Sequence, residues 1–268
     1  MTQLTTLKIL IRGAGEMATG VACRLHRSGF RRILLTEIPQ PLAVRRTVSF
    51  CEAVIHGSHS VEDVHAIRID DAGLASEIWE KAAIPIIIDP ENISRNEFEP
   101  DILVDAVMAK RNTGVSISDA PLVIALGPGF SAGADAHCVI ETNRGHDLGR
   151  LLYDGPASPD TGIPGPIGGH TSDRVLRAPC DGLFESDHSI GDIVQSGQQI
   201  GTVSKKPVAS KLNGTLRGLI CPGVTVTQGL KIGDVDPRGI VSYCYTISEK
   251  ARALGGSVLE AVLAHYNK

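Results

Sequence analysis

Residues 8–37 read KILIRGAGEMATGVACRLHRSGFRRILLTE, and they contain two short apolar runs separated by a glycine turn and a helical pattern. Lys8–Ile11 and Ile33–Leu35 have the composition of buried strands. Between them, Met17–His26 places its apolar residues on one face of a helix. A parallel strand pair joined by such a helix requires a right-handed crossover. The stretch therefore predicts the beginning of an α/β domain.

Further apolar runs predict additional strands of the same sheet. These runs are Ala53–Ile55, Ala66–Ile69, Ile84–Ile88, Ile102–Val107 and Leu122–Leu126. The runs at 84–88 and 122–126 are apolar throughout, which is typical of strands covered on both faces. A helix is expected over Leu74–Lys81. Residues 1–145 are therefore predicted to form a Rossmann-like domain with a doubly wound parallel sheet.

The turn between the first strand and the first helix fits the pattern G-x-G-x-x-G/A over Gly13–Ala18. Gly13 would form the turn, and Gly15 would let a diphosphate approach the backbone. The small residue Ala18 permits close packing of helix on strand. The amino end of the helix then offers N–H donors to an anion. This arrangement predicts a nucleotide site.

Glu37 follows Gly15 by 22 residues and ends the next predicted strand, where a carboxylate can accept a hydrogen bond from a ribose. The expected cofactor is therefore NAD or NADP. Arg45–Arg46 lies near enough in the sequence to meet a 2′-phosphate, so the choice between the two stays open. The alternative interpretation is a Rossmann-like turn that holds no nucleotide.

A block rich in polar residues, 127–147, follows the last apolar run, at a place where ligands bind in open α/β sheets. The candidate catalytic residues in this block are Asp135, His137, Arg144 and His146. Gly127 and Gly129 are expected to line the second face of the cofactor site. The block lacks the lysine of a Walker motif. No metal site is expected, because His137 and Cys138 would face opposite sides of a strand.

Residues 182–203 and 214–235 are two copies of one segment, GLFESDHSIGDIVQSGQQIGTV and GTLRGLICPGVTVTQGLKIGDV. Each copy alternates apolar and polar residues between glycines, which predicts short strands that pack across the two copies. The pattern resembles the biotinyl/lipoyl carrier domain, a barrel-sandwich hybrid. Its junction, 204–213, has no M-K-M or D-K signature, and Pro207 follows Lys206 directly. Neither biotin nor lipoate is therefore expected.

These patterns divide the chain into four segments. Residues 1–145 form the nucleotide-binding domain, and 146–175 form a Gly/Pro-rich linker or active-site loop. Residues 176–240 form the barrel-sandwich-hybrid-like domain, and 241–268 form a C-terminal helical segment. A break is expected at Gly255-Gly256 within the helix Ser248–Asn267, because each glycine lowers helix stability by about 1 kcal/mol.

Composition and charge exclude several classes of partner. The net charge of −4 provides no basic field, so nucleic acid is not expected. No apolar run approaches the roughly 18 residues of a membrane span, so no membrane is expected. The six cysteines are scattered without a C-x-x-C motif, which indicates reduced thiols and a cytoplasmic protein. Whether the chain forms a homo-oligomer stays open.

Several motifs together resemble the YqeB family. They are GAGEMATG (13–20), DAVMAKRN (105–112), GPGFSAGADAHCVIETNRGHDLGR (127–150), DTGIPG (160–165), RAPCDG (177–182) and KIGDVDPRG (231–239). The resemblance implies a role in the maturation of selenium-dependent molybdenum hydroxylases. It further implies a hydroxylase client or cofactor-maturation proteins as partners, and a molybdopterin nucleotide as a ligand. XdhC-type accessory proteins, which serve molybdenum hydroxylases, likewise contain a Rossmann-like domain.

Three functions follow from these observations, and whether the protein is an enzyme stays open. The first is an accessory protein that binds a dinucleotide or pterin nucleotide and helps a molybdenum hydroxylase mature. The second is an NAD(P)-dependent oxidoreductase acting on a small acid, with His137 or His146 as proton donor. The third is a non-enzymatic docking scaffold with an empty nucleotide fold.

Overall fold

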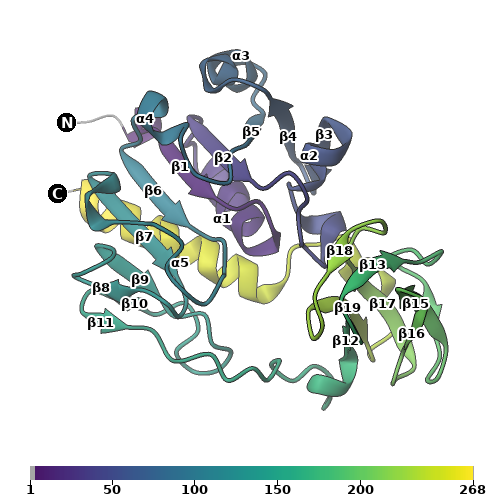
Figure 1. Cartoon of the computed structure of the whole chain (residues 1–268). Coiled ribbons are helices and arrows are strands. Elements are labelled where there is room, and N and C mark those ends of the chain that lie inside the picture. Colours follow the sequence, from purple (N-terminus) through teal and green to yellow (C-terminus); the bar gives the residue numbers. More distant parts are fainter. Residues whose placement is uncertain (1–3, 268) are drawn as a thin grey trace. The chain divides into compact units, whose positions relative to one another are not determined.

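The structure is a computed structural model of the chain that describes residues 4–267 (Figure 1). The chain divides into two compact units. Unit 1 comprises Met1–Pro41, Ser49–Thr161 and Ile247–Lys268, and unit 2 comprises Leu42–Val48 and Gly162–Thr246. The boundaries differ from the four expected segments, because 42–48 belongs to unit 2 and the C-terminal helix belongs to unit 1.

Unit 1 has a mixed α/β fold around a sheet with the strand order β10-β9-β7-β6-β1-β2-β5-β4-β3. The strands are β1 (Ile9–Arg12), β2 (Ile33–Glu37), β3 (Ser58–Val61), β4 (Val64–Ile69), β5 (Ile84–Ile88), β6 (Ile102–Asp105), β7 (Leu122–Leu126), β9 (Cys138–Ile140) and β10 (Leu151–Leu152). All neighbouring strands from β9 through β7, β6, β1, β2 and β5 to β4 pair in parallel. The edge strands β3 and β10 pair antiparallel with β4 and β9. A short pair, β8 (Ser131–Ala132) and β11 (Gly155–Pro156), forms a second sheet.

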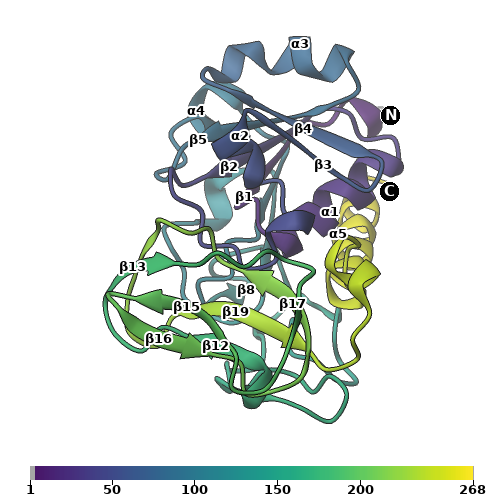
Figure 2. The same ribbon diagram turned by 90° about the vertical axis from the view of Figure 1, so that its right-hand side faces the viewer.

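Helices cover the sheet of unit 1 and bury its central strands. They are α1 (Glu16–Arg27), α2 (Glu52–His56), α3 (Ala75–Glu80), α4 (Arg95–Phe98) and α5 (Glu249–Tyr266). Figures 1 and 2 show α1 and α5 side by side, and α5 also packs on β7 and β9. Every residue of β7 is buried, as its continuous apolar run predicts, and so is every residue of β1 and β6. In β5, the other continuous run, residues 84–86 are buried and Ile87 and Ile88 are half-buried.

Six of the seven runs predicted as strands are strands, and one prediction is wrong. Ala53–Ile55 lies within the helix α2, because three apolar residues in a row fit a buried helix turn as well as a strand. The neighbouring edge strand β3 (Ser58–Val61) has the sequence SHSV, and its polar, mostly exposed side chains hid it from the sequence pattern.

The predicted break at Gly255-Gly256 is also wrong, because α5 continues through both glycines. Gly255 faces α1, and a Cβ at this position would lie 2.7 Å from the carbonyl oxygen of Gly20. Gly20 is equally close to α5, since its Cβ would lie 2.7 Å from the Cβ of Ala251. The glycines allow the two helix backbones to approach closely, and this packing offsets the low helix propensity of glycine.

Unit 2 consists of two four-stranded antiparallel sheets within the described residues. The first contains β12 (Val175–Arg177), β19 (Lys231–Asp236), β17 (Gly214–Leu219) and β14 (Ile193–Val194). The second contains β16 (Lys206–Ala209), β15 (Gln199–Val203), β13 (Gly182–Glu185) and β18 (Thr225–Val226). Phe184, Leu216 and Val226 belong to the buried core of this unit.

The two copies of the repeated segment interleave in these sheets. Strand β14 of the first copy pairs with β17 of the second, and β18 of the second copy pairs with β13 of the first. The junction between the copies forms the hairpin β15–β16, with a turn at Ser204 and Lys205. Each copy therefore completes a sheet of the other, which explains why neither could bury its apolar face alone.

The helices of the described part of the chain are either too short or too polar to cross a membrane. The short 3₁₀ helices of the two units are η1 (Leu4–Thr6), η2 (Arg46–Val48), η3 (Ala72–Leu74), η4 (Ile117–Asp119), η5 (Ser172–Arg174) and η6 (Val241–Cys244). The Gly/Pro-rich stretch expected at 146–175 contributes β10 and β11 to unit 1 before it enters unit 2 at Gly162.

Candidate functional site

The central parallel strands of unit 1 end at one edge of the sheet. From β1 the strand order runs through β2 and β5 on one side, and through β6 and β7 on the other. Open α/β sheets bind ligands beyond the carboxyl ends of the strands, where the order reverses in this way. The candidate site is therefore the edge formed by the carboxyl ends of β1 and β6, which we call the carboxyl edge.

Gly13 forms the turn that leaves β1 at this edge. Its φ of +88° lies in the left-handed region, which favours glycine. A Cβ at this position would lie 3.2 Å from the carbonyl oxygen of Ala106, directly after β6. Gly13 is therefore required by the backbone conformation and by the packing of two strand ends.

Gly15 lies in the same turn, but the fold does not require a glycine there. Its φ of −69° and ψ of −176° are ordinary extended values, and nothing lies within 4 Å of the position that a Cβ would take. Gly15 is also the N-cap of α1, and as a glycine it offers no side-chain oxygen to the first N–H groups of this helix. Open space beside a helix N-terminus accommodates a phosphate group.

Glu37, at the end of β2, lies beside the glycine turn, as predicted from the sequence. Its Oε2 accepts a hydrogen bond from the Ala14 N–H at 2.9 Å, and Oε1 accepts one from the Ile38 N–H at 2.8 Å. Burial raises the pKa of Glu37, while these two hydrogen bonds act in the opposite direction. Each carboxylate oxygen keeps a second lone pair, so Glu37 can still accept a bond from a ligand hydroxyl.

A buried ion pair between Arg12 and Asp105 joins the ends of β1 and β6, and the sequence analysis missed it. The guanidinium Nη1 of Arg12 lies 2.7 Å from Oδ2 of Asp105, and Arg12 also donates to the carbonyl of Thr113. Burial raises the pKa of Asp105, and the charge of Arg12 opposes this shift. A signal was present, because Arg12 directly follows the apolar run Lys8–Ile11 and Asp105 interrupts the run Ile102–Val107.

Gly127 and Gly129 also lie at the carboxyl edge, and each is required for packing within the chain. A Cβ at Gly127 would lie 2.5 Å from Oγ1 of Thr142, and one at Gly129 would lie 2.5 Å from the backbone of Arg111. The loop after β6 is itself constrained, since Met108 and Lys110 have positive φ. The structure thus explains both glycines without a ligand.

The structure does not bring His137 to the carboxyl edge. His137 directly precedes β9 and exchanges hydrogen bonds with the backbone of Val123, so it lies at the amino ends of the strands. Its ring lies 6.4 Å from the ring of His265. Asp135 accepts hydrogen bonds from the Ser131 N–H and, at 3.3 Å, from the side chain of Asn112, and so shapes its loop.

Arg144 and His146 follow the carboxyl end of β9, on the same edge as the glycine turn but with β6 and β7 between. Arg144 forms an ion pair with Glu249 in the first turn of α5. His146 is exposed in the loop that follows. Arg144 and His146 therefore share an edge with the predicted cofactor residues.

Lys250, in the first turn of α5, is a further titratable group that the sequence analysis missed. Burial lowers the pKa of Lys250, and the charge of Arg144 acts in the same direction. The carboxylates that oppose this shift are Glu16, Glu141 and Asp160. Glu16 accepts a hydrogen bond from the Ser248 N–H, 3.3 Å away. Within residues 4–267, no three His, Cys, Asp or Glu side chains are grouped to hold a metal ion.

Some solved structures resemble the chain only weakly. An aspartoacylase family protein from Mesorhizobium loti is 13% identical over 85% of this chain and 84% of that chain, with a TM-score of 0.27. The ectoine utilization protein EutE (DoeB) from Ruegeria pomeroyi is 14% identical over 80% of this chain and 61% of that chain, with a TM-score of 0.24. TM-scores of this size do not establish a common fold.

A known protein sequence is much more similar. No family model matches the chain. The protein YqeB of Escherichia coli (strain K12) is 46% identical to it over 255 residues, which are 95% of this chain and 47% of that protein. The chain therefore spans about half the length of this relative. Over that shared length, the chain is a relative of YqeB.

Proposed function

We propose that unit 1 binds the diphosphate of a dinucleotide or pterin nucleotide at the turn Gly13–Ala18. The observation that carries this proposal is the geometry of Gly15, which has an ordinary backbone conformation and open space where a Cβ would lie. A glycine that the fold does not require is explained by a ligand that approaches its backbone. The N–H groups at the start of α1 would donate to the phosphates.

The strand order supports a Rossmann-like nucleotide fold. The parallel strands β5-β2-β1-β6-β7 follow the pattern 3-2-1-4-5 when they are numbered along the chain without β3 and β4. Glu37 would accept a hydrogen bond from the ribose, and its negative charge would disfavour a 2′-phosphate. Arg45 and Arg46 donate to backbone carbonyls within unit 2. We therefore favour NAD over NADP among the nicotinamide cofactors.

We further propose that the chain acts as an accessory protein in the maturation of a selenium-dependent molybdenum hydroxylase. This pathway rests on the family resemblance. The interleaved copies and the hairpin junction of unit 2 support a barrel-sandwich-hybrid architecture, which would dock the client enzyme or other maturation proteins. The nucleotide handled at the carboxyl edge would then be part of the molybdenum cofactor or a dinucleotide used in its modification.

Equilibrium binding to the purified chain tests the nucleotide site, with NAD(H), NADP(H), CTP and molybdopterin dinucleotides as ligands. We expect at least one of them to bind and Gly15→Asp to abolish binding, because the new carboxylate would fill the open space and repel phosphate. Gly256→Ala is the matched control, since Gly256 also has nothing within 4 Å of its Cβ position but lies in α5. Failure of every ligand to bind would rule out the proposal.

An oxidoreductase remains the second candidate, with a different proton donor. His137 lies at the amino ends of the strands, whereas Lys250 lies in the first turn of α5 and has a lowered pKa. A lowered pKa makes a lysine a better proton donor than an unperturbed lysine. Turnover of NAD(P)H that is lost in Lys250→Met and kept in His137→Ala would support this alternative. Nucleotide binding without turnover would favour the accessory protein.

A further inference from the structure

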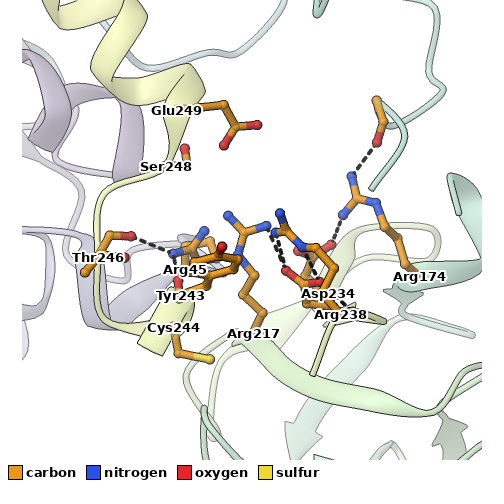
Figure 3. Close-up of polar contacts among 12 residues, drawn as sticks. Arg45, Arg174, Arg217, Asp234, Arg238, Tyr243, Cys244, Thr246, Ser248 and Glu249 are labelled. Carbon is orange, nitrogen blue, oxygen red and sulfur yellow. Dashed lines mark hydrogen bonds and ion pairs between the residues drawn. The ribbon is translucent and has the colours of Figure 1, made fainter. Parts of the chain in front are cut away.

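Four arginines of unit 2 gather their side chains in one region, which we call the arginine cluster: Arg45, Arg174, Arg217 and Arg238 (Figure 3). They come from separate segments, namely the loop before η2, the end of η5, strand β17 and the loop after β19. Arg45, Arg174 and Arg217 are only 7%, 5% and 5% exposed. Arginine is almost never buried to this extent without ionic partners.

One carboxylate of the cluster is Asp234 in β19, which is 3% exposed. Arg174 forms an ion pair with it and also donates to the carbonyl of Gly165, 3.0 Å away. Lys231 lies 3.3 Å from the same carboxylate. Two cations therefore share this buried negative charge.

The other carboxylate is Asp236, which is 1% exposed. Arg238 binds it with two donors, Nε at 2.9 Å and Nη2 at 2.6 Å. Arg217 reaches it with Nη1 at 3.5 Å, which is long for a hydrogen bond. Asp236 is therefore mainly the partner of Arg238, and its interaction with Arg217 is weak.

Some buried N–H donors of the cluster have no hydrogen-bond partner among the described residues, and Arg174 and Arg217 each carry one. In both residues this donor is Nε. A buried donor without a partner is costly, and such groups commonly indicate a ligand or ion that binds there. Arg217 is stronger evidence for a ligand than Arg174, because its single ion pair is also the longest of the cluster.

A β-bulge at Arg217 directs its side chain toward the other arginines of the cluster. In the pairing of β17 with β19, Gly218 is opposite Asp234 and Leu216 is opposite Val235, so Arg217 has no cross-strand partner. Bulges of this kind bend a strand and redirect a side chain, and they are frequent beside binding sites. The exposure of Arg217 is low, so the bulge directs its guanidinium inward rather than to solvent.

The remaining arginines are held in place by backbone and ring contacts. Arg45 donates to the carbonyls of Tyr243 at 2.8 Å and Thr246 at 3.2 Å, and Arg238 lies 4.7 Å over the ring of Tyr243. Figure 3 shows the guanidinium groups of Arg45, Arg217 and Arg238 turned toward one another. Like charges that converge away from water repel, and an anion between them removes that repulsion.

We propose that the arginine cluster binds a small molecule through a phosphate or carboxylate group, at a second ligand site in unit 2. Planar guanidinium groups match both kinds of oxyanion with paired N–H bonds. The oxyanion would accept hydrogen bonds from Nε of Arg217 and from its neighbours. This site is independent of the glycine turn, because all of its residues belong to unit 2.

The experiment uses the full chain with inorganic phosphate and malonate, a tetrahedral and a planar oxyanion, titrated by calorimetry at constant ionic strength. We expect saturable binding of at least one of them and a higher unfolding temperature in its presence. Arg217→Gln should weaken binding about tenfold, the loss expected for one charge-assisted hydrogen bond. Arg177→Gln is the matched control, since Arg177 is exposed on β12 and donates to the carbonyl of Gly229.

Two further variants still test the proposal if Arg217→Gln does not fold stably. Arg217→Lys retains the charge but loses the planar fork, so it should lower malonate affinity more than phosphate affinity. Gly15→Asp should leave malonate binding unchanged, which separates this site from the nucleotide site. The proposal is overturned if neither anion binds the unmodified chain, or if binding is lost in Gly15→Asp and kept in both Arg217 variants.

Discussion

Gly13 and Gly15 stand two positions apart in one turn, yet they are glycine for different physical reasons. The positive φ of Gly13 and the nearby carbonyl of Ala106 exclude a side chain at that position. At Gly15 the backbone is extended and the space beside it is open. Substitution at these two positions should therefore separate stability from ligand binding.

Gly13→Ala should lower the free energy of unfolding by about 1–2 kcal/mol or more, because alanine is strained at this φ. Gly15→Asp should change it by less than about 0.5 kcal/mol, because aspartate is a favoured N-cap residue in an extended conformation. Urea unfolding of both variants measures the difference. Equal destabilisation by the two substitutions would show that Gly15 is also a structural glycine.

Asp236 should make the protein sensitive to acid. Burial alone would raise the pKa of Asp236, but its ion pairs with Arg238 and Arg217 more than reverse this, so the pKa falls below its usual value. The unfolded chain then binds more protons in acid than the folded chain does. Stability from Asp236 is therefore present above a pH of about 4 and lost as the pH falls below it.

Asp236→Asn should therefore flatten the fall of the unfolding free energy below about pH 4, although the variant is less stable at neutral pH. The measurement is the urea midpoint at several pH values. Asp187→Asn, which changes an exposed carboxylate of the same unit, is the control. An unchanged slope in Asp236→Asn would contradict the pKa shift.

At the scale of elements, the contact between α1 and α5 shows how packing overrides propensity. Gly20 and Gly255 meet where the helices lie closest, and either Cβ would clash with the backbone of the other helix. Gly256, the next residue of α5, has open space beside it. The sequence pattern treated both glycines of α5 as helix breakers, because the distance to α1 is not visible in the sequence.

Gly255→Ala should destabilise unit 1 by about 1–3 kcal/mol through overpacking against α1. Gly256→Ala should stabilise it by about 0.5–1 kcal/mol, because alanine is the better helix former and meets no neighbour. Thermal unfolding of the two variants checks both signs. If both substitutions stabilise the protein, the helices separate more easily than the structure implies.

At the scale of the whole molecule, residues 42–48 belong to unit 2 although they lie far from it in the sequence. Val44 accepts a hydrogen bond from the Leu219 N–H, and Arg46 donates to the Leu219 carbonyl, both at 2.8 Å. These bonds attach the segment to the end of β17. Unit 2 therefore includes residues 42–48, a short segment that lies in the sequence between two parts of unit 1.

A fragment of residues 162–246 should consequently be less stable than the same fragment with residues 40–49 fused to it. We expect a difference of about 2–4 kcal/mol, from several hydrogen bonds of roughly 1 kcal/mol each. Urea unfolding followed by circular dichroism compares the two fragments. Identical midpoints would show that residues 42–48 do not contribute to the stability of unit 2.

Local patterns were sufficient to predict a large part of this protein. The strand, glycine turn, helix and strand of residues 8–37, the position of Glu37 beside the turn, and the repeated segments of unit 2 all follow from residues close in sequence. Periodicity and turn chemistry act over a few residues, so the chain itself specifies these features. The repeat also implied that the two copies pack on one another, whereas their exchange of strands appears only in the structure.

Only the tertiary structure decided which distant residues meet. The ion pair of Arg12 with Asp105 spans 93 positions, and the arginine cluster draws on four segments of unit 2. His137 was separated from the glycine turn because β9 runs parallel to β7 and begins at the opposite edge. Such contacts depend on strand order and helix packing, which a single sequence does not display because they join residues with no local relation.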